Sequence, residues 1–232
     1  MAKSVRLPIT MTDREKLLGF GYAAIDLFLL PSLLMGMNAL LARPLSAAWI
    51  NFLYFALNFV FLWAIFHRFL KRSIAFGGKN ITQLFGAAFL GFIAYWVANF
   101  ALSFCILQFF PDYSNPNDGS IAEMTGGNFP MMAIGTVLFV PMAEELIHRG
   151  LVFGLLLPKS KTAAYLVSAA LFAAIHVVGY AGSVDSTSLV LAFIQYLPAG
   201  LVLGWAYEKG GTIIVPMVIH MAINAMGIWA MR

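Results

Sequence analysis

The chain has 232 residues, of which 61% are hydrophobic and only 10% are charged, and its mean hydropathy is +0.86. A soluble domain carries about 25% charged residues, so this chain lacks the polar residues that would cover a surface facing water. The net charge of +4 does not indicate a nucleic-acid partner, because the basic residues lie between apolar runs and form no stripe interleaved with aromatic residues. The single cysteine, Cys105, excludes an intramolecular disulfide and a cysteine-based zinc site.

Apolar runs recur along the chain at the length of roughly 20 residues that a membrane-spanning helix needs. We therefore predict one all-α domain, a polytopic transmembrane helix bundle of about seven spans. The predicted spans are 17–42, 48–69, 82–110, 130–157, 163–181, 188–207 and 212–230. The first follows a capping-box pattern, Thr12-Asp13-Arg14-Glu15, and it is too long to be the apolar core of a cleaved signal peptide. The connection from Pro111 to Phe129 is rich in Pro, Asn, Asp, Ser and Gly, which predicts a solvated outer loop.

The charges between the predicted spans give an orientation. Basic residues gather on the cytoplasmic side of membrane proteins. With the N-terminus inside, the inner segments hold Lys3, Arg6, Arg14, Lys16, Arg68, Lys71, Arg72, Lys79, Lys159, Lys161 and Lys209. The outer segments hold Arg43, Arg232, Asp112, Asp118, Glu123 and Asp185. We therefore expect a cytoplasmic N-terminus and, in a bacterial host, a place in the inner (plasma) membrane.

Several ionisable residues fall inside the predicted spans rather than between them. The fourth span contains Glu144, Glu145 and Arg149. An acid or an arginine at the centre of a spanning helix costs about 2.5–3.5 kcal/mol, so such residues need partners or a function. Glu145 and Arg149 are one helical turn apart and can pair, whereas Glu144 points about 100° away and lacks that partner.

Imidazole and amide side chains lie at a similar depth in two other spans: His176 in the fifth, His220 and Asn224 in the seventh. Together with Glu144 they are predicted to converge on one water-filled pocket. A carboxylate there can take a proton from water and return it to a leaving amine, while imidazoles and an amide orient the water and stabilise an oxyanion. Glu144, His176 and His220 also match the ligand set of a catalytic zinc site. The residues alone leave both a divalent metal such as zinc and a metal-free mechanism open.

Three motifs in order, Glu144-Glu145-x-x-x-Arg149, Phe172-x-x-x-His176 and His220-x-x-x-Asn224, resemble the CPBP family of intramembrane proteases. That family includes the CAAX prenyl endopeptidases and the abortive-infection or bacteriocin-processing membrane proteins. The resemblance covers about residues 130–230. It implies that residues 1–129 are N-terminal transmembrane helices and an outer loop, and that residues 130–232 are the catalytic core, with the active site among the last four spans.

The resemblance also implies a role for each motif residue. Glu144 would be the base that activates water, and His176 would hold that water or a metal. His220 and Asn224 would stabilise the oxyanion, while Glu145 and Arg149 would support the site.

These observations predict an intramembrane endopeptidase that acts on a membrane-associated peptide or protein within the lipid bilayer. The prenylated substrates of eukaryotic relatives are an analogy only. The alternatives are a non-catalytic scaffold or immunity protein of the same fold and a proton-coupled transporter. Single residues also have structural interpretations: Glu145 with Arg149 as an ion pair, Asn224 as a bond between helices, and His148 and His67 as residues without a role. Asp26, an acid inside the first span, is assigned no place in the site.

Overall fold

The computed structural model describes residues 7–231, so three of the charges used for the orientation, Lys3, Arg6 and Arg232, lie outside the described residues. The chain is helical, and no β-strand forms within residues 7–231. The helices are α1 Asp13–Phe28, α2 Leu30–Ala39, α3 Ala47–Lys79, α4 Ile81–Phe109, α5 Pro116–Thr125, α6 Phe129–Ile134, η1 Gly135–Phe139, α7 Val140–Glu145, η2 Leu146–Phe153, α8 Gly154–Leu156, α9 Lys161–Val177, η3 Val178–Tyr180, α10 Ser186–Gly210 and α11 Ile214–Ala230.

The predicted helical membrane bundle is confirmed, and the count of about seven spans stays a prediction. Among the described residues, five helical segments are long and apolar enough to cross a membrane: α3, α4, α6 to α8, α9 with η3, and α10. The pair α1 and α2 would be a sixth span, bent by 44°, and α11 is a shorter apolar helix. The bend follows from Pro31, which lies at the start of α2 and cannot donate a backbone hydrogen bond back into α1.

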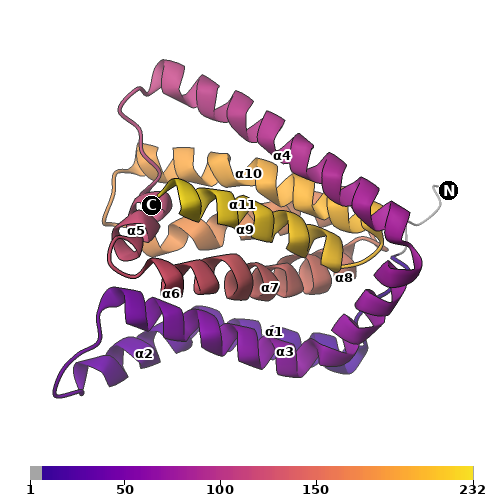
Figure 1. Cartoon of the computed structure of the whole chain (residues 1–232), viewed down its shortest axis with the longest axis horizontal. Helices are drawn as coiled ribbons and strands as arrows, with labels where there is room; N and C mark the ends of the chain where they lie inside the picture. The colour runs from indigo at the N-terminus through magenta and orange to yellow at the C-terminus, as the bar shows by residue number, and fades with distance from the viewer. Residues whose placement is uncertain (1–6, 232) are drawn as a thin grey trace.

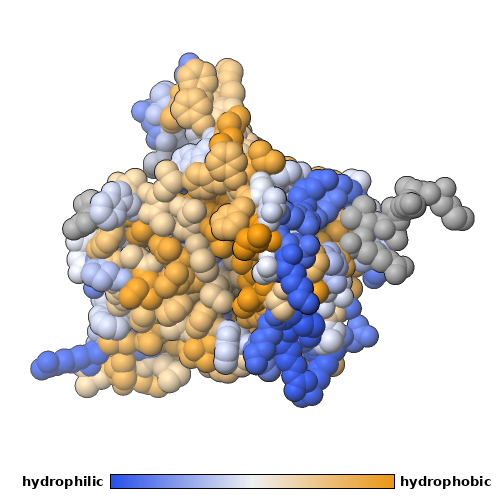
Figure 2. Space-filling model, turned by 45° about the vertical axis from the view of Figure 1, so that its right-hand side comes forward, coloured by the Kyte–Doolittle hydropathy of each residue, from blue (hydrophilic) through white to orange (hydrophobic). Residues whose placement is uncertain are grey.

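The long helices alternate in direction along the bundle (Figure 1). One end of the molecule therefore gathers the α3–α4, α8–α9 and α10–α11 connections, with Lys79, Lys159 and Lys209 in or beside them. We call this the basic end. Figure 2 shows a hydrophilic band at one end of a surface that is otherwise largely apolar. Large apolar side chains such as Phe85 and Phe100 of α4 are exposed, as expected for a surface that faces lipid.

The connection from Pro111 to Phe129 is not a simple solvated loop, which corrects the prediction. It contains α5, whose first backbone amides are capped by the Asn115 side chain. Pro116 occupies the first position of the helix, where its missing N–H costs nothing. In Figure 1, α5 lies across the end of the bundle opposite the basic end, beside the C-terminal end of α11.

The helix that carries Glu144 is irregular. Two π-helical stretches, η1 and η2, flank the short α7. Such wider turns are frequent at functional sites because they change the direction of side chains and leave carbonyl groups available. The carbonyl of Glu144 accepts a hydrogen bond from Nδ1 of His148 at 2.8 Å, and the carbonyl of His148 accepts one from Ser168 of α9 at 2.8 Å. The first bond lies within the irregular helix, and the second attaches this helix to α9.

Candidate active site

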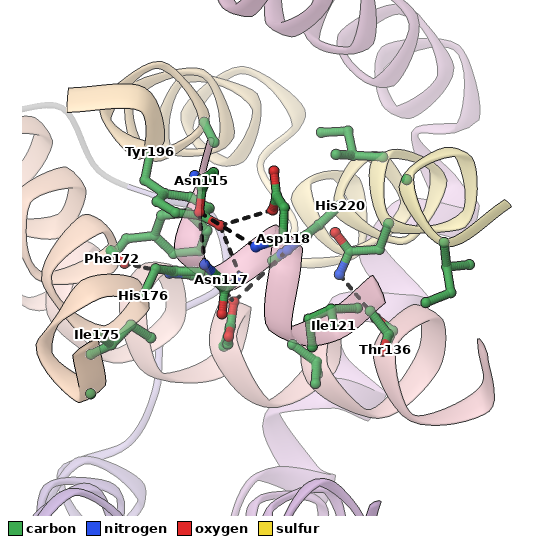
Figure 3. A pocket seen from close by; sticks show the side chains of 18 of the residues that line it. Asn115, Asn117, Asp118, Ile121, Thr136, Phe172, Ile175, His176, Tyr196 and His220 are labelled. Carbon is green, nitrogen blue, oxygen red and sulfur yellow. Dashed lines mark hydrogen bonds and ion pairs between the residues drawn. The ribbon is translucent and has the colours of Figure 1, made fainter. Parts of the chain in front are cut away.

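A cavity of about 820 Å³ runs from α5, at the end opposite the basic end, into the bundle. Glu144, His176, His220 and Asn224 all line it, although they come from α7, α9 and α11. The structure thus brings together the four polar residues that the sequence places at similar depth. Figure 3 shows His176 and His220 among the side chains that surround this space.

The Glu144 carboxyl lies between the two imidazoles without bonding to either. Its Oε2 atom is 3.8 Å from Nε2 of His176 and 3.8 Å from Nε2 of His220. Both distances exceed a direct hydrogen bond. This oxygen is buried and has no hydrogen-bond partner among the described residues. A buried carboxylate oxygen of this kind calls for a bridging water or a ligand group.

On each imidazole, a hydrogen bond holds the Nδ1 edge, opposite the Nε2 atom that faces Glu144. Nδ1 of His176 bonds to the backbone carbonyl of Phe172 at 2.7 Å, and Nδ1 of His220 bonds to Oε1 of Glu145 at 2.9 Å. A carbonyl only accepts hydrogen bonds, so His176 carries its proton on Nδ1. The same assignment suits His220 beside an ionised Glu145. In the neutral rings, each Nε2 therefore presents a lone pair toward Glu144.

Glu145 and Arg149 lie behind the cavity, not on its wall. Both side chains are fully buried, and Nη1 of Arg149 donates to Oε1 of Glu145 at 2.9 Å. The guanidinium also donates to the carbonyl of Gly200 at 3.2 Å and lies 4.3 Å from the centre of the Phe172 ring. Because the same Glu145 oxygen meets Arg149 and His220, the ion pair is connected directly to one imidazole of the site.

Asn224 lines the cavity, but one of its amide hydrogens is used elsewhere. Its Nδ2 donates to the carbonyl of Thr136 at 2.9 Å, which ties α11 to η1. This hydrogen bond between helices is the one that the structural interpretation of Asn224 predicts. The second hydrogen of the amide is the one that remains for an oxyanion.

Sequence reasoning missed three residues beside His176. Tyr196 of α10 stacks on the imidazole with ring centres 4.1 Å apart, and its hydroxyl bonds to Asn117 and Asp118 of α5. Figure 3 shows these groups close together on one side of the cavity. An Asn followed by Pro is a helix-start signal that would have indicated α5, but nothing in the sequence pairs that helix with Tyr196.

Asp26 also belongs to the surroundings of the site. It lines the large cavity and a second, mostly apolar cavity of about 270 Å³, and Glu144 lines both. His148 contacts the second cavity with Nδ1 bonded to the Glu144 carbonyl. His67 bonds to the Ala64 carbonyl of its own helix and lines neither cavity.

The donor types at the site suit zinc, and the Glu144 oxygen lies 3.8 Å from both imidazole nitrogens. Zinc binds imidazole nitrogen and carboxylate oxygen at about 2.0–2.2 Å. Within residues 7–231, no three His, Cys, Asp or Glu side chains lie close enough together to hold a metal ion. Metal binding by Glu144, His176 and His220 therefore stays a prediction.

Comparison with known proteins finds a family model that matches the part of the chain carrying these residues. Residues 126–226, which include all three motifs, match the family model described as type II CAAX prenyl endopeptidase Rce1-like. The chain is also 25% identical over 174 residues to the UPF0177 protein YxdF of Lactococcus lactis subsp. lactis (strain IL1403), covering 74% of this chain and 88% of that protein. No solved structure matches the chain. The resemblance carried by the three motifs is thus confirmed, and the apolar helices together with this match support an integral, multi-pass membrane protein that resembles the CAAX proteases.

Proposed function

We propose that this protein is an intramembrane endopeptidase in which Glu144 activates the water that attacks a peptide bond. The observation that carries the proposal is the buried, unpartnered Oε2 of Glu144, 3.8 Å from Nε2 of both His176 and His220. A water molecule in this space can donate hydrogen bonds to acceptors on either side. Its own lone pair then faces the cavity, where a substrate carbonyl would lie.

In the reaction, Glu144 takes a proton from the water as the water oxygen bonds to the carbonyl carbon. The carbonyl oxygen becomes an oxyanion in the tetrahedral intermediate. The proton on Glu144 then moves to the nitrogen of the leaving amine as the C–N bond breaks, which yields a carboxylic acid and an amine. Glu144 ends the cycle in the form in which it began.

The two imidazoles have different surroundings and take different roles in this proposal. Nδ1 of His176 meets only a backbone carbonyl, so this ring accepts a hydrogen bond from the attacking water. Nδ1 of His220 meets the Glu145 carboxylate, which can stabilise positive charge on the ring. For this step the proposal requires the form of His220 with a proton on both ring nitrogens, in which Nε2 donates to the oxyanion instead of accepting; the free amide hydrogen of Asn224 is the second donor.

We propose a substrate that reaches the site from the end opposite the basic end, since the cavity is lined there by α5. If the basic end faces the cytoplasm, as the distribution of Lys and Arg predicts, the substrate is a membrane-associated peptide or protein that enters from the outer side of a bacterial inner membrane. Alkaline phosphatase and green fluorescent protein fused to the C-terminus of the chain test this orientation. With a cytoplasmic N-terminus and seven crossings, phosphatase activity is expected and fluorescence is not.

The test of catalysis compares the purified wild-type protein with Glu144→Gln in proteoliposomes. Each is incubated with a proteome-derived peptide library, and new peptide termini are identified by mass spectrometry. We expect cleavage by the wild type and a loss of at least a hundredfold in Glu144→Gln, because an amide cannot accept the proton. The control is Glu123→Gln, the same chemical change at an exposed position of α5 that lines neither cavity.

Equal cleavage by the wild type and Glu144→Gln would overturn the proposal. The absence of any cleavage by well-folded wild-type protein would favour the scaffold. Proton flux into liposomes that is abolished by Glu144→Gln would favour the transporter.

A further inference from the structure

His176 is held on one edge and on one face. Its Nδ1 bonds to the Phe172 carbonyl one turn earlier on α9, which fixes one edge of the ring. The Tyr196 ring lies against its face, with 4.1 Å between centres and 28° between planes. A single hydrogen bond still allows an imidazole to tilt about the bonded edge. The Phe172 ring also contacts the imidazole, at 4.6 Å between centres and tilted by 48°, but the Tyr196 ring is the one stacked on its face and so limits this tilt and the distance between Nε2 and Glu144.

Tyr196 is in turn held by α5. Its hydroxyl accepts a hydrogen bond from Nδ2 of Asn117 at 2.9 Å and donates one to Oδ1 of Asp118 at 3.3 Å. The residue before it on α10, Gln195, accepts a bond from Nδ2 of Asn115 at 2.9 Å. The N-terminal turn of α5 is thus bound to two successive residues of α10. A phenol bonded on both sides cannot rotate or slide without breaking these bonds.

We propose that Tyr196 is a positioning residue: it sets the plane of the His176 imidazole, and α5 fixes Tyr196 through its hydroxyl. The catalytic consequence rests on the proposed function, since it requires His176 to orient the attacking water. The structural consequence does not, because the orientation of the His176 ring is measurable in a protein that cleaves nothing. This gives α5, which lies outside residues 126–226, a defined task in the site.

Two variants separate the ring of Tyr196 from its hydroxyl. Tyr196→Phe keeps the contact with His176 but loses the bonds to α5, whereas Tyr196→Leu loses the aromatic face itself. The matched control is Tyr165→Phe, which removes another part-buried tyrosine hydroxyl, bonded to Glu208 at 2.6 Å, and lines neither cavity.

The first measurement is nuclear magnetic resonance of the full chain in detergent micelles with ¹⁵N-labelled imidazoles. The chain has only four histidines, so the signals of His176 are identified by their loss in His176→Gln. In the wild type and in Tyr165→Phe we expect a single His176 species with the proton on Nδ1. In Tyr196→Leu we expect exchange-broadened signals or a mixture of ring states, and in Tyr196→Phe a smaller change of the same kind.

The second measurement is the rate of cleavage of the peptide that the wild type cleaves best in the library. Loss of a residue that orients a site histidine typically lowers activity about 10- to 100-fold. We therefore expect kcat of Tyr196→Leu to fall by roughly this factor, while KM changes less than about threefold. For Tyr196→Phe, loss of hydroxyl bonds predicts a fall in kcat of about fivefold.

The proposal is overturned if Tyr196→Leu leaves the His176 signals unchanged, even if the variant is less stable. It is also overturned if kcat falls equally in Tyr165→Phe, since that would reflect general destabilisation. A wild-type protein that cleaves no peptide would contradict the proposed function alone, and the His176 signals would still decide the positioning role.

Discussion

Glu145→Gln is the perturbation that best tests how the charges inside this bundle are held. It leaves the guanidinium of Arg149 buried without its counter-ion. The two groups are 2.9 Å apart with both side chains 0% exposed, and at an effective dielectric constant of about 20 their attraction is about 6 kcal/mol. Desolvation of both ions offsets much of this value. Removing one partner of a buried pair nevertheless costs about 3–5 kcal/mol, because the other charge stays buried.

The expected effect of Glu145→Gln is a lower melting temperature in detergent, followed by near-ultraviolet circular dichroism. For a domain of this size, 3–5 kcal/mol corresponds to roughly 6–20 °C. The control is Lys161→Met, which breaks the 2.7 Å pair with Glu208 at the basic end, where the lysine side chain is 53% exposed. The Glu208 side chain is only 7% exposed, but it keeps the hydrogen bond from the Tyr165 hydroxyl and its lysine partner is open to solvent, so this variant should lose clearly less stability than Glu145→Gln does.

A double variant completes the test. Glu145→Gln with Arg149→Met removes both charges, and we expect it to be less destabilised than the sum of the two single variants. The reasoning would be refuted if Glu145→Gln lowered the melting temperature no more than Lys161→Met does. Strict additivity of the two single variants would refute it as well, because it would mean that the pair has no coupling energy.

Three further predictions concern packing, catalysis and pH, and a fourth concerns metal. A Cβ at Gly200 would lie 2.6 Å from Cα of Ala169, so Gly200→Ala should lower the free energy of unfolding by about 1–3 kcal/mol. Reversible unfolding in mixed detergent measures this value. An unchanged free energy of unfolding would contradict the close packing of α9 on α10. Asn224→Ala should lower kcat about a hundredfold, because a donor to the oxyanion is lost. An unchanged kcat would mean that Asn224 has only the structural role given by its bond to Thr136. Desolvation by its neighbours raises the pKa of the Asp118 carboxyl above the ordinary value, although the residue keeps contact with solvent. The folded state therefore disfavours the charged form, and a modest part of the stability is lost as pH rises through that range. Asp118→Asn should therefore melt at a higher temperature than the wild type at pH 7, with a difference that shrinks toward pH 4; a constant difference would contradict this. Finally, cleavage should survive exhaustive chelation, because the proposed steps use only side chains of the chain; loss of activity that added zinc restores would show a metal mechanism.

Much of the site was accessible from the sequence because lipid makes polar residues conspicuous. Glu144, His176 and His220 are expensive inside apolar spans, and their spacing places them at similar depth, so their gathering at one cavity follows from a few rules about helices. The same rules identified the pair of Glu145 and Arg149 from a separation of four residues. These are local or periodic features, and a sequence displays them directly.

The contacts that the sequence did not reveal are those between elements far apart in the chain. Tyr196 is one aromatic residue among many in an apolar helix, and 79 residues separate it from Asn117. The π-helical stretches around α7 were also missed, and so was the bend between α1 and α2, although Pro31 is a local signal that could have indicated it. Asp26 was noticed as an unusual acid, but only the fold places it on the wall that Glu144 shares.

The difference between two adjacent glutamates is the strongest physical argument about this site. Glu145 is fully buried, and its Oε1 has a cation and an imidazole as partners, although its Oε2 is buried without a partner among the described residues. Glu144, one residue away, has a buried oxygen without any such partner among residues 7–231. In folded proteins, a buried polar group without a partner is found mainly where function requires it. A carboxyl group that accepts and releases protons cannot also be locked into an ion pair. The ion pair that Glu145 makes and Glu144 lacks is therefore the reason for proposing Glu144, and not Glu145, as the residue that activates water.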